Sequence, residues 1–465
     1  MIDNNLKIAF YTLGCKVNQY ETQALKETFK NRGFMIVDEH KDADIYVVNT
    51  CTVTNLADRK SRQYIRRMKK QNPESIIAVI GCYAQVSPDE ASAIEGVDIV
   101  VGNNEKNSLP DYVDGLLNER ILGKREEKPI VHILSREELT YYEGGSAITT
   151  MESRTRAYIK IQDGCDQFCS YCIIPYARGP VRSRPSKEII MEAESLLKKG
   201  FKELVLTGIN TALYGAENRR NAKTGIYDIE SIVKCLNDLP GDFRIRLGSL
   251  EPTVVDVNLA VELLKYEKLC HHMHLSLQSG SDSILRSMNR HYDRSGYLKI
   301  VDALRKEDKF YGISTDVIVG FPGEKDDDFK DSIDLVRQVR FVKTHVFPYS
   351  KRKGTKAATM DDHLDNQTKK KRSAKLTQVA EESALSFLKS TIESVRKVLF
   401  EEYEESTGLV SGYSDNFIKV YYQVSNRKTA EEMINTLVPI RFKKLYLDGI
   451  LGEPEYKTRR EIRDE

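Results

Sequence analysis

Three cysteines in one short segment are the clearest chemical signal in the sequence. Cys165, Cys169 and Cys172 lie within DGCDQFCSYCIIPYARG. Because each residue adds only about 3.3–3.6 Å of reach, three thiolates this close can wrap one small inorganic centre. Soft thiolates select zinc or an iron–sulfur cluster. Three protein ligands on a four-iron cluster leave one iron open to bind a substrate or a cofactor.

A structural zinc site is the main alternative for this loop. Such a site is closed by four ligands. His271, His272 and His274 could supply the fourth, but they fall in and beside a predicted strand far along the chain. The spacing therefore favours an open cluster, with zinc and inert buried thiols as the competing interpretations.

Three further cysteines, Cys15, Cys51 and Cys82, each follow the carboxyl end of a predicted strand. In a parallel sheet these ends meet at one edge, where ligands bind. The pattern suggests a second three-thiolate site, and an ordinary buried thiol is the alternative for each cysteine read singly. Cys235 and Cys270 have no partners in register and are predicted to be core or incidental residues.

The elements that would position this second set alternate between strand and helix. Such alternation indicates a parallel sheet covered on both faces. The predicted strands are Lys7–Leu13, Ile45–Asn49, Ile76–Ile80 and Val97–Val101, with helices near Glu21–Asn31 and Ala57–Lys70.

The cluster loop itself begins after the first strand of a second alternating region. Six strand–helix units predict a partial (β/α)6 barrel, whose active site lies at the carboxyl ends of the strands. Those ends carry glycines and polar residues, as in TGIN, GSLEP, QSGSD and GFPGE. The predicted strands are Tyr158–Gln162, Leu204–Thr207, Arg244–Leu247, His272–Leu277, Thr315–Val319 and Thr344–Phe347.

The end of the chain changes character again. A basic, polar stretch (351–375) leads into a helix predicted near Gln367–Arg396, and short β-rich runs follow, at Leu399–Tyr403, Ile418–Tyr422 and Val438–Phe442. A small β-barrel of this size suits RNA or single strands. The predicted fold class is thus α/β, with domains at 1–119, 154–385 and 386–456 and a linker at 120–153 that contains Glu143-Gly144-Gly145-Ser146.

Length and composition fit this three-domain plan. The 465 residues are 40% hydrophobic and 30% charged, which excludes a disordered chain. With 71 basic and 69 acidic residues, the net charge of +2 identifies no partner. No apolar run reaches the roughly 18 residues of a membrane span, and the start of the chain does not read as a signal peptide. Eight cysteines without an export signal argue for a reducing, cytoplasmic location rather than a disulfide framework.

One predicted helix carries a basic face. Residues 57–70 hold seven basic side chains and one acidic side chain, and the face could contact RNA phosphates, with a solvated surface helix as the alternative. Basic residues after the cluster loop (Arg178, Arg182, Arg184) and after the last barrel strand (Lys351, Arg352, Lys353, Lys356) could likewise steer a polyanion. The candidates on the helix are Arg59, Arg62, Arg66, Lys69 and Lys70.

Long motifs also match known proteins. The three-cysteine loop with Tyr171 before its last cysteine resembles the signature of radical S-adenosylmethionine enzymes. TLGCKVNQYET, VVNTCTVTNLADRKSRQ and IGCYAQ resemble the N-terminal domain of the methylthiotransferases. NTCTVTN, IIPYARGPVRSR and HVFPYSKRKGT most resemble the MtaB-type branch, which modifies threonylcarbamoyladenosine in tRNA. The resemblance covers essentially the whole chain, and the tail is similar to the family's TRAM domain.

The resemblance implies two [4Fe–4S] clusters. Cys165, Cys169 and Cys172 would hold the cluster that chelates S-adenosylmethionine and cleaves it to methionine and a 5′-deoxyadenosyl radical. Cys15, Cys51 and Cys82 would hold an auxiliary cluster that carries the sulfur to be inserted. The family pattern further implies S-adenosylmethionine contacts at Tyr171, Gly208, Glu251, Gln278, Ser279 and Gly320. Asn210 and Ala212 depart from relatives that often carry His and Gly there, without removing a cluster ligand.

The implied reaction adds a methylthio group at C2 of the N6-threonylcarbamoyladenosine next to the anticodon. Since an adenine C2–H has no appreciable acidity, radical chemistry is a plausible route where a general base alone fails. The implied partners are the anticodon stem-loop of tRNA, an electron donor such as flavodoxin or ferredoxin, and a sulfur donor, with no membrane. The alternatives are isopentenyladenosine in tRNA, an aspartate of a ribosomal protein, and a non-catalytic, zinc-stapled RNA-binding protein.

Overall fold

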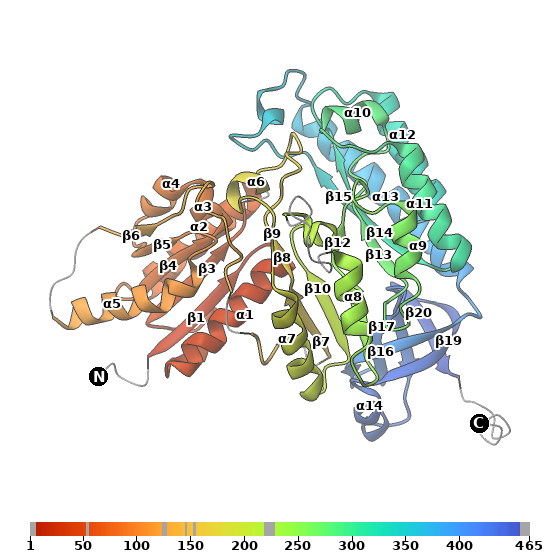
Figure 1. The fold of residues 1–465 in the computed structure, drawn as a ribbon, viewed down its shortest axis with the longest axis horizontal. Helices are drawn as coiled ribbons and strands as arrows, with labels where there is room; N and C mark the ends of the chain where they lie inside the picture. The colour runs from red at the N-terminus through yellow and green to blue at the C-terminus, as the bar shows by residue number, and fades with distance from the viewer. Residues whose placement is uncertain are drawn as a thin grey trace.

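The computed structural model describes residues 6–52, 55–122, 128–144, 147–151, 155–217 and 228–455. Figure 1 shows an N-terminal α/β unit beside a central half-open barrel, with a small β-barrel below the latter. Gly145 and Ser146 of the predicted linker lie outside the described residues. Among the described helices, none is both long and apolar enough to cross a bilayer.

The N-terminal unit is a six-stranded, fully parallel sheet in the order β2-β1-β3-β4-β5-β6. Its central strands β3 and β4 are buried along their whole length, as their unbroken apolar runs predict. The strands are β1 (Lys7–Thr12), β2 (Met35–Val37), β3 (Ile45–Thr50), β4 (Ile76–Gly81), β5 (Ile99–Val101) and β6 (Ile130–His132).

Helices cover both faces of this sheet. Leu25 and Phe29 of α1 (Lys16–Asn31) pack with α5 (Leu109–Ile121) on one face. Tyr64, Ile65 and Met68 of α2 (Asn55–Gln71) pack on the other, together with α3 (Cys82–Val86) and α4 (Pro88–Ser92). The predicted α/β sandwich is confirmed. Strands β2 and β6, each three residues long, lack a detectable periodicity, and β6 comes from the segment predicted to be a linker.

The central unit is a partial barrel of parallel strands. One sheet has the order β11-β10-β7 and the next β12-β13-β14-β15, joined by a bridge between Ile245 and Leu269. The six predicted strands all form, within a few residues of the expected bounds. They are β7 (Arg156–Lys160), β10 (Glu203–Thr207), β11 (Arg244–Leu247), β13 (His272–Leu275), β14 (Gly312–Val319) and β15 (Lys343–Pro348), with two-residue additions β8 (Gln162–Asp163), β9 (Arg182–Ser183) and β12 (Ser249–Leu250).

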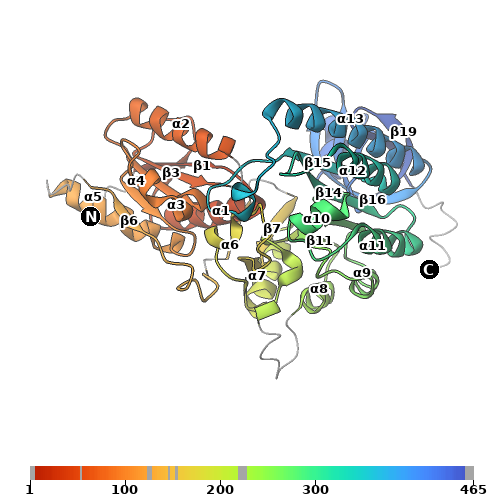
Figure 2. The same cartoon turned by 90° about the horizontal axis from the view of Figure 1, so that it is seen from above.

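Helices line the outside of this barrel, and Figure 2 shows the N-terminal unit beside β7. Tyr20 and Ala24 of α1 belong to the apolar core of the barrel, so one helix serves two cores. The outer helices are α7 (Ser186–Lys198), α8 (Ile229–Asn237), α9 (Val257–Leu263), α10 (Asp282–Ser287), α11 (Arg294–Glu307) and α12 (Asp326–Val339), with α6 (Ile174–Ala177) after the cluster loop.

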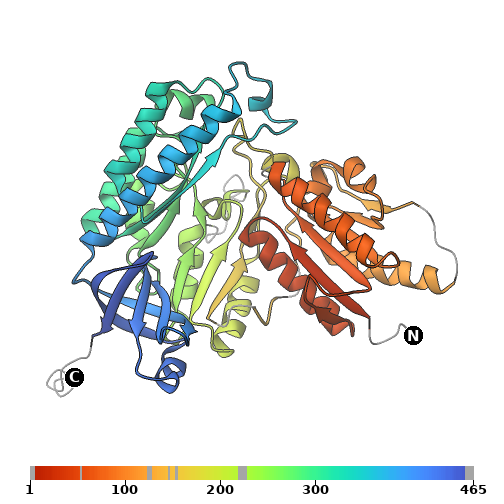
Figure 3. The same ribbon diagram turned by 180° about the vertical axis from the view of Figure 1, so that it is seen from behind.

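The long helix α13 (Asn366–Ser390) runs from the top of the barrel down to the tail unit, as Figure 3 shows from behind. It ends before the predicted Arg396, since β16 already begins at Val395. The tail is a closed barrel in the order β16-β17-β18-β20-β19, which confirms the predicted small β-barrel. Its elements are β16 (Val395–Glu404), β17 (Leu409–Ser414), β18 (Lys419–Gln423), α14 (Arg427–Met433), β19 (Leu437–Tyr446) and β20 (Gly449–Pro454).

Buried ion pairs connect the tail to the base of the central barrel. Glu203 binds Arg244 (Nε–Oε2 2.5 Å) and Arg246 (Nε–Oε1 2.9 Å). The same arginines donate to backbone carbonyls of Tyr413 and Ser414 in the tail. The charges of one domain thereby satisfy the backbone of another, which fixes the position of the tail.

Candidate functional site

The cluster loop leaves β8 through Gly164, whose φ is +71°. A Cβ there would lie 1.8 Å from the Pro180 carbonyl oxygen, so only glycine permits this turn. The Cys165 amide donates to the Gly179 carbonyl (3.0 Å), and the Cys172 amide donates to that of Cys169 (2.9 Å). Backbone hydrogen bonds thus close the loop that carries the three thiols.

The three thiols interact electrostatically with one another. Burial raises the pKa of Cys172 to about 12, and the pKa of Cys165 and Cys169 is also raised, chiefly by burial. Thiolates therefore require a positive centre among them, which a soft metal or an iron–sulfur cluster supplies. The donor set fits the cluster that the sequence implies.

Arg290 reaches this triad from the barrel wall. Its Nη1 lies 3.1 Å from the Cys169 sulfur and 2.9 Å from an oxygen of Glu251. Asn210 Nδ2 donates to the other oxygen of Glu251 (3.1 Å). Glu251, a predicted cofactor residue, thus holds the guanidinium that faces the Cys169 sulfur.

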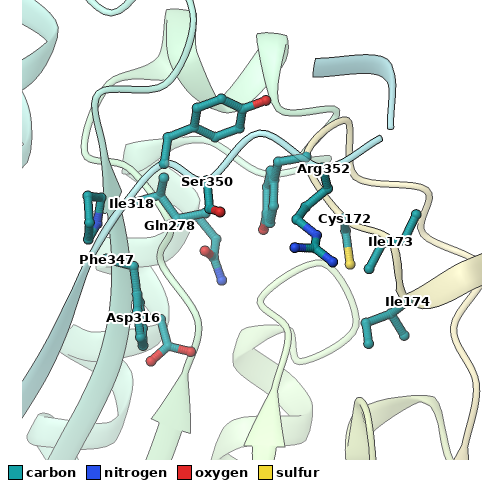
Figure 4. Close-up of a pocket in the computed structure, with 12 residues that line it drawn as sticks. Cys172, Ile173, Ile174, Gln278, Asp316, Ile318, Phe347, Ser350 and Arg352 are labelled. Carbon is teal, nitrogen blue, oxygen red and sulfur yellow. The ribbon is translucent and has the colours of Figure 1, made fainter. Parts of the chain in front are cut away.

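A cavity of about 250 Å³, here the cluster-loop cavity, opens beside Cys172. Figure 4 shows Cys172 and Arg352 across it from Asp316 and Phe347, with Gln278 between the barrel strands. Tyr171 and Gln278, two of the predicted cofactor residues, line it. Gln278 has a φ of +65°, which costs about 1–3 kcal/mol for a residue other than glycine and is typical of functional positions.

The other predicted cofactor residues lie elsewhere around the barrel mouth. Gly208 lines a neighbouring cavity. Ser279 is fully buried and accepts from the Ser281 amide, and the Gly320 amide donates to Glu324 (2.7 Å). The structure therefore gathers Tyr171 and Gln278 with the cluster loop and gives Ser279 and Gly320 roles in shaping loops.

The N-terminal triad is assembled from three strand ends. Gly14, with a φ of +107°, lets Cys51 pack against it, because a Cβ there would lie 2.7 Å from the Cys51 Cβ. Cys15 interacts electrostatically with Cys82. The structure brings the three predicted cysteines to one edge of the sheet.

One side-chain amide and one hydroxyl connect these three loops. Asn18 Nδ2 donates to the carbonyls of Leu13 (2.7 Å) and Thr50 (3.0 Å), and Thr50 Oγ1 donates to that of Ile80 (2.6 Å). Each loop that carries a cysteine is therefore bonded to its neighbour, so the triad has a fixed shape without help from the cysteines.

A buried ionic cluster, here the Glu21 cluster, joins the N-terminal unit to the barrel. Glu21 of α1 binds Arg178 (2.9 Å), Lys160 (2.7 Å) and Lys106. These cations hold the pKa of Glu21 well below its usual value against the effect of burial, Arg178 contributing most. Asn103 Nδ2 also bridges to Ala177 of the barrel (2.6 Å) and lies 3.6 Å from the Cys82 sulfur.

A second cavity of about 450 Å³, here the interdomain cavity, lies between α1 and the inside of the barrel. Cys15 and Lys16 line it from the N-terminal unit. Asp316 and Phe347 line both this cavity and the cluster-loop cavity. One cysteine of each triad, Cys172 and Cys15, thus lines one of two adjoining cavities that share a wall.

The basic face of α2 is present in the structure. Arg59, Arg66 and Lys70 are exposed, whereas Arg62 is half-buried beside the Tyr83 ring (5.9 Å). Lys69 donates to the Ser75 carbonyl (3.0 Å). Three of the five candidates on α2 are therefore open to a phosphate, and two are partly engaged within the protein.

The arginines after the cluster loop require a correction. Arg178, Arg182 and Arg184 are 0%, 3% and 4% exposed. Arg182 donates to the Leu139 carbonyl (3.1 Å), and Arg184 pairs with Glu192. The prediction that they face RNA is wrong, because the interface between the first two domains covers them. Arg352 is likewise buried against Asp58 (2.7 Å).

The histidines of the zinc alternative have partners of their own. His271 pairs with Asp308 (2.7 Å), and His272 and His274 bond to Ser314 (2.9 and 3.0 Å). In the part of the chain that the structure describes, none of them contacts a cysteine of the cluster loop. Cys270 is buried, as a core residue should be.

Sequence reasoning missed Arg290 and Asp316 as site residues and misplaced Arg178. Each is a single charged residue in the sequence, without a partner at a diagnostic spacing. Asp316 lies within the barrel strand β14, and a carboxylate inside an otherwise largely apolar barrel strand is the one signal that could have identified it.

Family comparisons agree with this geometry. Residues 7–102 match the family described as "Uncharacterized protein family UPF0004", and residues 159–336 match the radical SAM superfamily. The threonylcarbamoyladenosine tRNA methylthiotransferase MtaB of Bacillus subtilis is 40% identical over 94% of each chain. MtaB of Thermotoga maritima is 35% identical over 95% of each.

A related enzyme with another substrate is more distant. The tRNA-2-methylthio-N(6)-dimethylallyladenosine synthase of Clostridium tetani is 32% identical over 97% of each chain. Among solved structures, the radical S-adenosylmethionine methyltransferase TsrM of Kitasatospora setae, with cobalamin and a [4Fe–4S] cluster bound, has a TM-score of 0.53 at 14% identity. The superposed region covers 76% of this chain and 74% of the TsrM chain, which shows a shared fold.

Proposed function

The chain belongs to the radical S-adenosylmethionine methylthiotransferase family, and we propose that it inserts a methylthio group at C2 of N6-threonylcarbamoyladenosine next to the anticodon of tRNA. The relatives named for threonylcarbamoyladenosine are 35–40% identical to the chain, and those named for dimethylallyladenosine are 32–34% identical. The first group favours this substrate over the dimethylallyl alternative.

One observation carries the proposal: Cys172 of one triad and Cys15 of the other line two cavities with a common wall at Asp316 and Phe347. Methylthio transfer uses one centre that cleaves S-adenosylmethionine and a second centre that carries the sulfur. One substrate can reach both centres only if their cavities adjoin. The cofactors are S-adenosylmethionine and two [4Fe–4S] clusters, which when bound supply the electron that cleaves S-adenosylmethionine and the sulfur to be inserted.

The protein's own residues bind and orient these groups. In the proposal, Cys165, Cys169 and Cys172 hold one cluster and Cys15, Cys51 and Cys82 the other. Arg290 places a positive charge 3.1 Å from the Cys169 sulfur. Tyr171 and Gln278 line the cluster-loop cavity, which is the proposed pocket for S-adenosylmethionine. The proposal also keeps Gly208, Glu251, Ser279 and Gly320 as cofactor contacts, on the family pattern alone.

The apolar part of the cluster-loop cavity keeps water away from the reaction. Ile173, Ile174 and Ile318 line it together with Phe347. A radical formed in a dry, enclosed space has few side reactions available. This lining is the contribution of the barrel that no cofactor supplies.

RNA docking belongs to the same proposal. Arg59, Arg66 and Lys70 on α2 would contact phosphates, with Arg62 and Lys69 at the edge of that face. The proposal keeps a division into a cluster-bearing domain (1–119), a barrel (154–385) and a TRAM-like RNA-binding domain (386–456), and the N-terminal sheet extends past residue 119 to β6. Reductive cleavage consumes an electron, so we include a flavodoxin- or ferredoxin-type donor, a sulfur donor and a cytoplasmic site of action, where tRNA is modified.

Anaerobic reconstitution tests the proposal. The holoenzyme is incubated with threonylcarbamoyl-modified tRNA, S-adenosylmethionine and dithionite, and nucleosides are analysed by mass spectrometry. We expect the methylthio derivative together with 5′-deoxyadenosine. Formation of 5′-deoxyadenosine with product only on isopentenyladenosine tRNA would replace the substrate, and zinc without sulfide in the purified protein would end the enzymatic interpretation.

A further inference from the structure

The interdomain cavity contains charged side chains whose partners can be followed one by one. Asp316 is engaged by His274 (Nε2–Oδ2 3.2 Å). Arg246 is bound by Glu203 and by backbone carbonyls of the tail domain. Both of these side chains already have partners among the described residues.

Lys16 differs from both. It follows Cys15 directly at the start of α1, and its Nζ lies 5.8 Å from the centroid of the Tyr158 ring, which also lines the cavity. Within the described residues, no carboxylate pairs with its ammonium group. The cavity therefore holds an ammonium that is available to an anion.

The walls around Lys16 suit a planar, partly polar ligand. Phe347 is 45% exposed and lies on the side shared with the cluster-loop cavity. A flipped base can stack on such a ring. A volume of about 450 Å³ is in the usual range of about 300–1,000 Å³ for small-molecule sites.

We propose that the interdomain cavity receives the modified adenine, with the carboxylate of its threonylcarbamoyl group paired to Lys16. This inference rests on the proposed function and names how the site recognises its substrate. The threonylcarbamoyl group carries a free carboxylate, while a dimethylallyl group is uncharged and would leave the ammonium without a partner. A site built for a charged group rejects the analogue that lacks it.

The placement also suits the reaction. Cys15, adjacent to Lys16, lies in the same cavity wall, so a base held through its N6 substituent remains next to the sulfur-bearing site. Phe347 and Asp316 place the same base against the S-adenosylmethionine pocket. Lys16 thus determines which substrate the cavity accepts. This role is separate from that of the cluster ligands.

The experiment compares two anticodon hairpins with the reconstituted wild-type enzyme. One hairpin contains N6-threonylcarbamoyladenosine, and the other contains the same nucleoside with its carboxylate converted to the primary amide. We expect kcat/KM for methylthiolation to be about 10- to 100-fold lower with the amide hairpin, because one charge-assisted hydrogen bond is lost.

Variants then locate the discrimination. Lys16→Gln should lower kcat/KM on the carboxylate hairpin by the same factor, so that this variant modifies the two hairpins equally well. Lys16→Arg should restore part of the preference for the carboxylate hairpin. Lys30→Gln, which changes an exposed lysine at the far end of the same helix, should keep the wild-type preference. Iron and sulfide content is measured for every variant.

Two results would overturn the inference. One is a wild-type enzyme that modifies both hairpins equally well. This result does not depend on the variants, so it would overturn the inference even if Lys16→Gln fails to keep its auxiliary cluster. The other is a Lys16→Gln protein with full cluster content that retains the wild-type preference. A wild-type enzyme that forms 5′-deoxyadenosine but modifies neither hairpin refutes the proposed function itself, and the inference with it.

Discussion

The two cysteine triads are built in opposite ways. Cys165, Cys169 and Cys172 lie within one loop whose backbone bonds close it upon itself. Cys15, Cys51 and Cys82 come from three strand ends and meet only because β1, β3 and β4 are neighbours in one sheet. The first site is a property of a segment and the second a property of a fold. The second therefore depends on more of the molecule, and the predictions below test that difference.

Removal of one cysteine from each triad should separate the two half-reactions. Cys169→Ala should abolish S-adenosylmethionine cleavage, by at least about 1,000-fold, because the cluster that supplies the electron loses a ligand. Cys51→Ala should keep 5′-deoxyadenosine formation and lose the methylthio product. Iron analysis should show about four fewer irons in each variant, as expected for one lost cube. An equal loss of S-adenosylmethionine cleavage in both variants would show that the two triads do not act separately.

The second triad should also depend on the Glu21 cluster. Glu21→Gln leaves Arg178, Lys160 and Lys106 buried around an uncharged side chain. We expect the free energy of unfolding to fall by about 3–5 kcal/mol, as measured by urea denaturation of the apoprotein. Glu95→Gln, at an exposed position, is the control and should change little. An unchanged urea midpoint for Glu21→Gln would show that the Glu21 cluster does not stabilise the docking of the two domains.

Arg290 tests whether the loop triad is as independent as its backbone suggests. Arg290→Gln removes the positive charge beside the Cys169 sulfur and leaves Glu251 without its ion pair. The rate of S-adenosylmethionine cleavage should fall about 10- to 100-fold while iron content stays near that of the wild type. Arg286→Gln, on the exposed side of α10, should behave like the wild type. A large loss of iron would mean that Arg290 builds the site rather than tunes it.

A single methyl group should distort the N-terminal triad. Gly14→Ala forces a side chain into a position with φ of +107°, 2.7 Å from the Cys51 Cβ. The strain of about 1–3 kcal/mol should lower stability and reduce auxiliary cluster occupancy, seen as lost iron with S-adenosylmethionine cleavage retained. The matched control is Gly115→Ala on α5, where a Cβ would meet nothing within 4 Å. Full iron content in Gly14→Ala would show that the three loops can relax.

Acid should act on a part of the molecule that holds neither triad. Arg244 and Arg246 hold the pKa of Glu203 well below its usual value despite burial. A carboxyl with a lowered folded pKa stabilises the protein above its unfolded pKa of about 4.3, and this stabilisation is lost as the pH falls toward the folded value. The urea midpoint should thus decline below about pH 4.3 in the wild type and more gently in Glu203→Gln. Identical pH profiles would exclude Glu203 as a contributor.

The same contrast explains what the sequence could predict. The cluster loop, the six barrel strands and the α/β sandwich follow from spacing and periodicity, since these are local signals. The meeting of Cys15 with Cys51 and Cys82 was predictable only through the topology of parallel sheets. The burial of Arg182 and Arg184 was not predictable, because a charged residue in a sequence reads as exposed until its partner, here Asp163 or Glu192, is placed beside it.

Helix α1 has a consequence for how the enzyme works. Its first residue follows Cys15, Glu21 lies near the end of its second turn, and Tyr20 and Ala24 are packed into the barrel. A rigid rod therefore spans from one cofactor site to the scaffold of the other. In the proposed function, this helix fixes the separation of the two cysteine triads as the polypeptide folds, so the substrate enters a cavity that already exists.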